Sequence, residues 1–172
     1  MSADPLKSRD RPATASGGSP KRGFFARGGA WVLAQSGSML AVLALGPLTA
    51  GNSGSVWRLT ALGLLLAGAA FGISGAWVLG RNRTIFPKPN NGSQLIRHGV
   101  YRLVRHPLYT SVTLLSLAWA AWWSSVPTLA VAVAQAVLLD RKARREEAWL
   151  RECFPEYAEY ARRVRRFVPW VY

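Results

Sequence analysis

The chain has 172 residues, half of them hydrophobic, and a formal net charge of +14. This length suits one domain, and the single cysteine excludes an internal disulfide or a metal site built on paired cysteines. The apolar residues lie in long uncharged runs and the basic residues lie between them, which indicates an all-α integral membrane protein and not a nucleic-acid-binding one. No His/Glu metal spacing is present, so we expect no metal.

Residues 1–22 are rich in Ser, Pro, Gly and charge, and we expect a disordered basic tail there. Residues 23–172 are predicted to form one membrane domain. The first apolar run begins late, is long for a signal peptide and is followed by further runs, so we interpret it as a retained span.

Four apolar runs predict about four transmembrane helices, at residues 30–50, 59–80, 107–124 and 126–142. The first two runs are long enough for a bilayer core, which takes about 20 residues. The last two are shorter and predict a C-terminal helical hairpin that continues into polar ends. In the second run, Gly68 and Gly72 would allow another helix to approach closely.

Basic residues precede the first run, separate the second from the third, and follow the fourth. The two remaining loops, residues 51–56 and 124–127, carry no charge. Because basic residues stay on the cytoplasmic side, we expect both termini and residues 143–172 to be cytoplasmic, in a bacterial inner membrane. Arg58 is the exception and would reach the headgroups of the far side.

Two charged stretches flank the hairpin, Gly99–Tyr109 (GVYRLVRHPLY) and Asp140–Pro155. We predict that they fold onto each other as a cofactor pocket at the cytoplasmic face. Pro107 suits the first position of the third helix, whose N-terminus would attract a polar or negative group.

A plainer alternative is that these residues are ordinary interface residues. Arg105, His106 and Tyr109 would then only anchor the helix end. Lys142 with Glu146, and Glu147 with Arg151, would form exposed salt bridges four residues apart.

The two stretches together, GVYRLVRHPLY and then EEAWLRECFPEYAEYARRV, resemble the isoprenylcysteine carboxyl methyltransferase family, with its bacterial members and the related phospholipid methyltransferases. The resemblance covers about Leu95–Pro169. It implies an integral-membrane enzyme that uses S-adenosylmethionine without a Rossmann domain. The cofactor contacts that it implies are Gln94, Leu95, Ile96, Tyr101, His106, Pro107, Leu108, Tyr109 and Glu146. The family's substrate-binding arginine corresponds to Lys142, with Arg141 beside it, and a lysine lacks the planar fork that suits a carboxylate.

The expected function is transfer of a methyl group from S-adenosylmethionine to a lipophilic acceptor. The acceptor would carry the carboxylate of an isoprenylcysteine-like compound, a thiol or an amine. One alternative is a phospholipid N-methyltransferase. A second, of another class, is a non-catalytic membrane protein that binds lipid or a partner through its basic segments. No catalytic residue is assigned, because an activated donor mainly requires positioning and the exclusion of water.

Overall fold

The computed structural model describes residues 29–80 and 95–172. Their elements are α1 (Gly29–Leu48), α2 (Ser55–Leu79), the 3-10 helix η3 (Gly99–Arg102), α3 (Pro107–Trp123), α4 (Val126–Cys153) and α5 (Tyr157–Arg163). Within these ranges the extended pairing is limited to one isolated bridge, between Val104 and Arg165. The all-α prediction is therefore confirmed for this part of the chain. The expected tail at residues 1–22, the loop before residue 95 and Gln94 lie outside the described residues.

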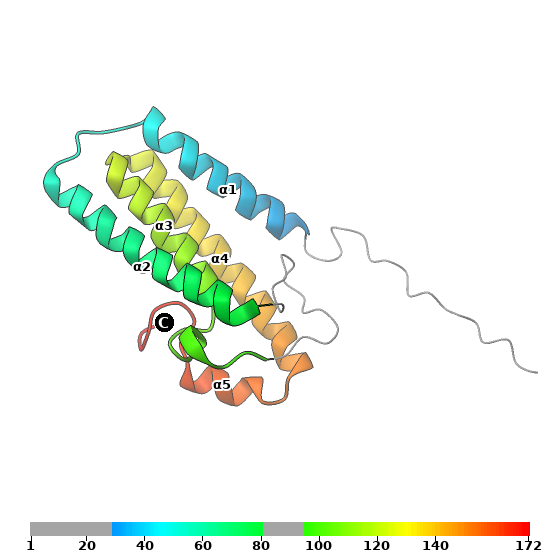
Figure 1. The fold of residues 1–172 in the computed structure, drawn as a ribbon. Coiled ribbons are helices and arrows are strands. Elements are labelled where there is room, and N and C mark those ends of the chain that lie inside the picture. Colours follow the sequence, from blue (N-terminus) through cyan, green and yellow to red (C-terminus); the bar gives the residue numbers. More distant parts are fainter. Residues whose placement is uncertain (1–28, 81–94) are drawn as a thin grey trace, which may run out of the picture.

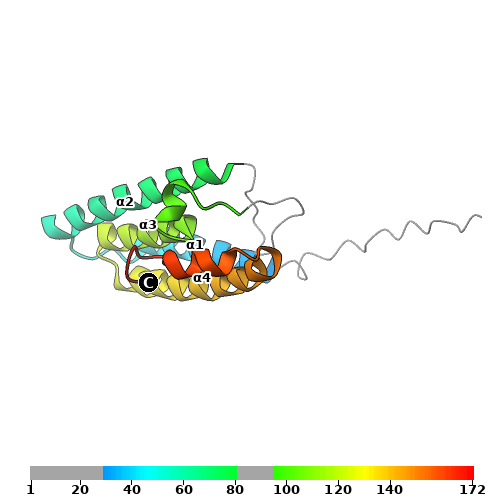
Figure 2. The same cartoon turned by 90° about the horizontal axis from the view of Figure 1, so that it is seen from below.

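Helices α1 to α4 lie side by side as an elongated bundle (Figure 1). Seen from below, α3 lies between α2 and α4 (Figure 2). The shorter elements η3 and α5 and the last residues of the chain gather at one end of this bundle (Figure 1). This end also carries the charged half of α4, as the hairpin prediction requires.

Prolines set the start of both hairpin helices. Helix α3 begins at Pro107, and His106 occupies the N-cap position, as predicted. Helix α4 has Pro127 in its first turn, where the missing N–H costs nothing. The Ser125 Oγ caps this helix by accepting a hydrogen bond from the Thr128 N–H at 3.1 Å. A proline at each start and a polar cap therefore explain the tight turn between them.

Helix α4 continues for 28 residues and ends at Cys153, two residues before Pro155. At about 1.5 Å per residue it is about 42 Å long, which exceeds a hydrocarbon core of about 30 Å. Helix α2 begins four residues earlier than predicted, at Ser55. Arg58 lies in its first turn with an exposed side chain, so the charge does not interrupt the helix.

Helices α1 and α2 are long and apolar enough to cross a membrane, with mean hydropathies of 1.5 and 1.9. Only 11% of the most apolar stretch of each is buried, so most of these side chains face outward. A core helix of a soluble protein would be mostly buried, whereas a lipid-facing helix presents apolar side chains outward. Helix α3 has only 17 residues and α4 is charged in its second half, so these two helices do not by themselves indicate spans.

Glycines of α2 allow close packing against α3. The Ser111 Oγ donates a hydrogen bond to the Gly68 carbonyl oxygen at 2.7 Å. A Cβ atom added at Gly72 would lie 2.5 Å from this same Oγ. At Gly75 a Cβ atom would lie 3.2 Å from both Pro107 and Leu108. The predicted small-residue contact is thus confirmed, and it fixes the start of α3 against α2.

Helix α1 attaches to the hairpin through polar side chains. The Gln135 Nε2 donates to the Ser38 Oγ at 3.1 Å, and the Ser116 Oγ donates to the Gln135 Oε1 at 2.6 Å. Near the other end of α1, the Thr49 and Ser125 hydroxyls lie 2.6 Å apart. Such bonds between helices stabilise packing where lipid offers no polar partner.

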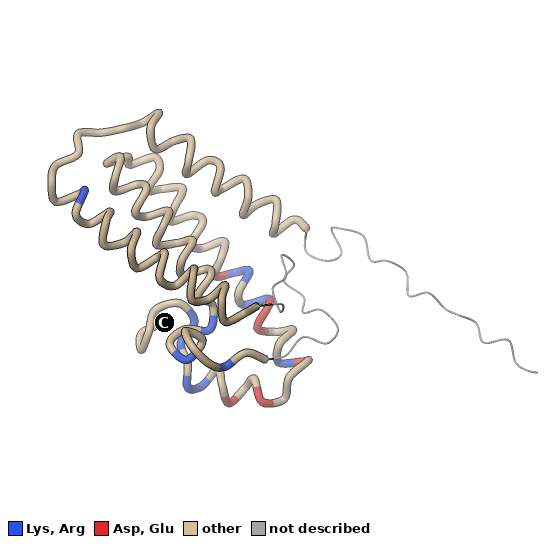
Figure 3. Tube along the Cα trace, in the orientation of Figure 1, with Lys and Arg blue, Asp and Glu red and all other residues tan. Residues whose placement is uncertain are grey.

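The charges of the described residues gather at one end of the bundle (Figure 3). The exception is the basic residue near the start of α2, Arg58, at the opposite end. The two connections at that opposite end, residues 49–54 and 124–125, carry no charge. This separation agrees with the pattern by which basic residues stay on one side of a membrane.

Candidate functional site

The charged end of α4 meets the start of α3 and the C-terminal segment, which we define as residues 164–172. The Arg105 N–H donates to the Arg165 carbonyl oxygen at 2.8 Å, and the His106 N–H donates to the Arg166 carbonyl oxygen at 3.1 Å. These bonds hold the C-terminal segment beside the first residues of α3. Three parts of the sequence therefore meet in one place, including the two charged stretches that we expected to fold together.

Glu147 is the centre of this contact and is fully buried. The Arg105 Nε and Nη2 each lie 3.0 Å from its Oε1. The Arg166 Nε donates to Oε1 and the Nη2 donates to Oε2, both at 3.0 Å, and the His106 Nε2 lies 3.2 Å from Oε1. Burial alone raises the pKa of Glu147, but hydrogen bonds from His106 and Arg166 outweigh burial and hold this pKa well below its usual range.

Glu146 has different surroundings although it is the adjacent residue. Its side chain is 15% exposed, and its Oε1 accepts a hydrogen bond of 2.5 Å from the Tyr109 hydroxyl. Its Oε2 lies 3.7 Å from the His106 Nδ1, which is beyond hydrogen-bond distance. Burial raises the pKa of Glu146. A carboxylate has about four acceptor positions, so Glu146 retains capacity for further donors.

Tyr109 lies between Glu146 and Lys142, the residue that reaches α1. Its ring stacks on the His106 ring with centroids 5.4 Å apart and planes 1° apart. The Lys142 Nζ lies 5.1 Å from the centre of the Tyr109 ring, close enough for a cation–π contact. The same Nζ donates to the Gln35 Oε1 of α1 at 2.7 Å. The site thus includes a buried ammonium, an aromatic face and a carboxylate within a few ångströms of one side chain.

Five of the site residues predicted from the sequence lie at this site: Tyr101, His106, Tyr109, Lys142 and Glu146. Tyr101 is buried, and burial together with the charge of Glu146 raises its pKa to about 12.

The other predicted site residues lie beside these five residues or away from them. Pro107 and Leu108 pack against Gly75. Leu95 and Ile96 are partly buried and lie in the irregular segment before η3. Arg141 is exposed, so the structure does not bring it together with Lys142.

Of the two exposed salt bridges in the plainer alternative, the Glu147–Arg151 pair forms with a buried acid, and the Lys142–Glu146 pair does not form. Glu147 does lie 3.5 Å from Arg151, but Glu147 is fully buried. Lys142 is also buried, and its hydrogen bond goes to Gln35 and not to Glu146. The reason is that this turn of α4 packs under α3 and α1, so both side chains point into the protein.

Several contacts could not be found from sequence patterns. Arg166 was not predicted to take part, because it lies 19 residues after Glu147 in a region without a clear motif. Gln35 lies within the first apolar run and belongs to no motif. The available signal was its amide within an apolar run, since a buried polar side chain must find a partner.

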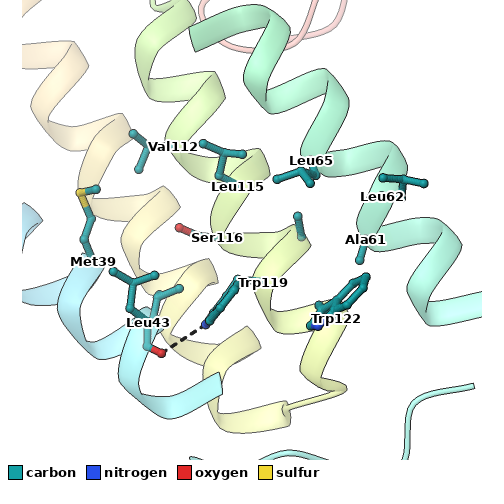
Figure 4. A pocket seen from close by; sticks show the side chains of 12 residues that line it. Met39, Leu43, Ala61, Leu62, Leu65, Val112, Leu115, Ser116, Trp119 and Trp122 are labelled. Atoms are coloured by element: carbon teal, nitrogen blue, oxygen red, sulfur yellow. Dashed lines mark hydrogen bonds between the residues drawn. The ribbon is translucent and has the colours of Figure 1, made fainter. Parts of the chain in front are cut away.

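An apolar pocket of about 440 Å³ lies among α1, α2 and α3 (Figure 4). Its lining includes Met39, Leu62, Val112 and Trp122, and the side chains in Figure 4 point into it from all three helices. The Trp119 Nε1 donates to the Leu43 carbonyl oxygen at 3.3 Å, so this polar group of the lining is satisfied. The pocket begins one turn along α3 from Tyr109.

The fold and site together define a helical membrane protein with a buried carboxylate site at its charged end. The chain belongs to the phospholipid methyltransferase family, whose sequence profile matches residues 56–157. This range covers α2, α3 and α4 and ends at the first residue of α5. The resemblance predicted from the sequence is confirmed at this level. The match leaves out α1, which carries Gln35, and the C-terminal segment, which carries Arg166.

Two relatives align with this chain. The cobalt-zinc-cadmium resistance protein CzcN of Cupriavidus metallidurans is 36% identical over 107 residues, which are 62% of this chain and 50% of that protein. The Delta(14)-sterol reductase TM7SF2 of Mus musculus is 34% identical over 85 residues, which are 47% of this chain and 20% of that protein. The aligned parts thus span half or less of these relatives.

Proposed function

We propose that the protein is a membrane methyltransferase that uses S-adenosylmethionine and methylates a lipophilic acceptor. Family membership supports this class of activity. The observation that carries the site assignment is the contrast between two adjacent acids. Arginines and His106 satisfy Glu147, whereas Glu146 is largely buried and, among the described residues, accepts a hydrogen bond from Tyr109 alone. A buried carboxylate with unused acceptor capacity is costly for folding, and a donor-rich ligand would offset that cost.

The donor set of this site fits the cofactor. S-adenosylmethionine carries a positive sulfonium, an ammonium and hydroxyl donors, all of which suit a carboxylate. Glu146 and Tyr101, with the stacked rings of His106 and Tyr109, would hold it, and Leu95, Ile96 and Gln94 would flank it. Pro107 and Leu108 would keep His106 and Tyr109 in place, since they fix the start of α3 against α2. When bound, the cofactor supplies a methyl group already activated for displacement.

Lys142 favours an anionic acceptor within this proposal. Its buried ammonium lies beside the Tyr109 ring, where it would attract a carboxylate or thiolate and repel the ammonium of an ethanolamine headgroup. Gln35 would position this ammonium through its 2.7 Å hydrogen bond. We therefore place a carboxylate of an isoprenylcysteine-like compound, or a thiol, ahead of phospholipid N-methylation as the reaction.

The apolar pocket would take the hydrocarbon part of the acceptor. Its lining is almost wholly apolar, and it begins one turn beyond Tyr109 on α3. An acceptor with its reactive group at Tyr109 and its chain in this pocket would lie along α3, within the expected bilayer. Such an arrangement would exclude water from the reacting end.

The test is transfer of a labelled methyl group from S-adenosylmethionine to lipid extract by the purified protein in nanodiscs. We expect label in the organic phase with the natural chain and with Glu159→Gln, a control on the exposed Glu159–Arg163 pair of α5. Glu146→Gln should reduce it at least tenfold. Label released by alkali would identify a carboxyl ester, and alkali-stable label would identify an N- or S-methyl product. No transfer by folded protein to any lipid fraction would favour a non-catalytic lipid- or partner-binding protein instead.

A further inference from the structure

A second hollow, of about 450 Å³, lies on the charged end and is lined by arginines from three parts of the chain. They are Arg105, Arg151, Arg162, Arg165 and Arg166. Among the described residues no Asp or Glu side chain lines it, and neither Glu146, Tyr109 nor Lys142 takes part in it. It is therefore separate from the proposed methyl-transfer site, with which it shares only the arginines that hold Glu147.

Not all of these guanidinium groups are used inside the protein. Arg105 binds Glu147, Arg166 binds both Glu147 and Asp140, and Arg151 reaches Glu147 only at 3.5 Å. The side chains of Arg162 and Arg165 are exposed and have no hydrogen bond or ion pair with any described residue. The hollow thus keeps an excess of positive charge. This charge is carried by guanidinium groups, whose forked N–H donors suit phosphate oxygens.

Beside the hollow, the C-terminal segment turns back on itself and presents apolar side chains outward. The N–H groups of Phe167 and Val168 both donate to the Tyr172 backbone oxygen at 2.7 Å. Trp170 at the tip is 84% exposed, and Val171 is 75% exposed. A tryptophan held outward beside arginines is typical of a membrane interface.

The level of this turn along the bundle is fixed by α3. The Thr110 Oγ1 in the first turn of α3 donates to the Phe167 carbonyl oxygen at 3.0 Å. The turn therefore lies where α3 would enter the bilayer, and the hollow lies at headgroup level beside it. A free phosphate compound would need the arginines alone and would leave the exposed tryptophan unexplained.

We propose that the arginine hollow binds the phosphate group of an anionic phospholipid in the leaflet at the charged end, while the turn around Trp170 inserts among its acyl chains. This lipid is not the methyl acceptor. It holds the C-terminal segment, and with it Arg166, against the membrane surface. The interaction is the electrostatic and interfacial type that basic pockets beside membrane spans make with headgroups.

The experiment measures binding of phosphatidylglycerol, presented in mixed micelles, to the full-length protein by microscale thermophoresis. Phosphatidylcholine, glycerol 3-phosphate and inorganic phosphate are measured in parallel. Arg162→Gln and Arg165→Gln should each weaken phosphatidylglycerol binding about fivefold, as expected for one basic residue at a membrane surface. The matched control is Arg163→Gln, since Arg163 is the neighbour of Arg162 on α5 but pairs with Glu159 and lies outside the hollow.

Trp170→Ala should weaken binding of the phospholipid and leave that of glycerol 3-phosphate unchanged. Equal loss in Arg163→Gln and Arg162→Gln would show a general effect of net charge and overturn the site. Inorganic phosphate that binds as tightly as phosphatidylglycerol would assign the hollow to a soluble ligand and overturn the lipid assignment. Thermal unfolding of each variant shows that the protein is folded, which the exposed positions of Arg162 and Arg165 lead us to expect.

Discussion

Glu146 and Glu147 are neighbours in the chain, yet a helix turns through about 100° per residue, so their carboxylates point in different directions. Glu147 meets the guanidinium groups of Arg105 and Arg166 at 3.0 Å and the His106 imidazole at 3.2 Å, with Arg151 farther away at 3.5 Å. Glu146 meets the Tyr109 hydroxyl, and burial raises its pKa. The surroundings of Glu147 stabilise its charged form. Those of Glu146 leave acceptor positions of its charged form without a hydrogen-bond donor among the described residues. We infer a structural role for Glu147 and a ligand-binding role for Glu146.

Glu147→Gln should destabilise the protein strongly. The amide would leave the buried guanidinium group of Arg105 without a counter-charge, and Arg166 would keep only Asp140, 2.9 Å away. Breaking such a buried pair typically costs about 3–5 kcal/mol. Glu146→Gln should cause no such loss, because an amide oxygen can still accept the Tyr109 hydroxyl and the buried charge is gone. Thermal unfolding in detergent at pH 7 measures both. A similar loss of stability in the two variants would contradict the division of roles.

Because their pKa values shift in opposite directions, we expect Glu146 and Glu147 to change the stability of the protein in opposite ways as pH changes. The lowered pKa of Glu147 contributes stability that is present above its ordinary value of 4.5 and is lost as pH falls below it. The raised pKa of Glu146 makes the folded protein less stable as pH rises from 4.5 through the raised value. Below pH 4.5 the natural chain should therefore lose stability faster than Glu147→Gln does, in unfolding scans across pH.

Lys142 and Arg141 offer a second comparison of adjacent residues with equal charge. Lys142 is buried beside Tyr109, while Arg141 is exposed. With an anionic acceptor, Lys142→Met should raise the acceptor KM about tenfold or more, since a hydrogen bond to a charged group contributes about 1.5–3 kcal/mol. Arg141→Met should change this KM less than twofold, and neither should change affinity for S-adenosylmethionine. An unchanged KM in Lys142→Met would remove the anionic acceptor from the proposal.

At the scale of the elements, the contact of α2 with α3 positions the site. Gly72 and Gly75 let α2 approach the first turns of α3, which carry His106 and Tyr109. This contact lies beside the site, so a change in it should move the site residues as well as lower stability.

Gly72→Leu should destabilise the protein by about 1–3 kcal/mol, because a side chain there would meet the Ser111 hydroxyl and displace its bond to Gly68. The matched control is Gly63→Leu on the same helix, where an added Cβ meets nothing within 4 Å. Thermal unfolding compares the two variants. Equal stability would mean that α2 can shift outward at no cost, and the glycine contact would then not position α3.

The sequence predicted the four long helices from their apolar runs, and prolines mark the bounds of the last two. Pro107 and Pro127 set the starts of α3 and α4, and Pro155 follows the end of α4, so local rules were enough. Helix α5 was missed, because its seven residues carry no long apolar pattern. The cluster around Glu147 could not be predicted either. It joins Arg105 and Arg166, 42 residues before and 19 residues after the acid, and such pairing depends on the folded chain.

At the scale of the whole molecule, the charges separate the two ends of the bundle (Figure 3). The four long helices lie side by side (Figure 1), which is the arrangement that four spans would need. The composition of α1 and α2 indicates two of these spans, and α3 and α4 would complete the set as their hairpin. This orientation, cytoplasmic at the charged end, remains a prediction.

The single cysteine allows a direct test of this orientation. Cys153 is exposed at the charged end of α4, so a membrane-impermeant maleimide should label it only after spheroplasts are permeabilised. Ser53→Cys, made together with Cys153→Ser, places the thiol in the uncharged loop at the other end and should be labelled in intact spheroplasts. Labelling of Cys153 from outside would reverse the orientation, and labelling of both positions from one side would exclude the four-span arrangement.

Calorimetric binding of S-adenosylmethionine and S-adenosylhomocysteine to the purified protein in detergent tests the central claim most directly. We predict that the natural chain binds both compounds and that Glu146→Gln, folded and at least as stable, binds them at least tenfold more weakly. The control Glu159→Gln should bind like the natural chain. Absence of binding by folded natural protein would contradict the methyltransferase proposal, and unchanged binding by Glu146→Gln would contradict the site.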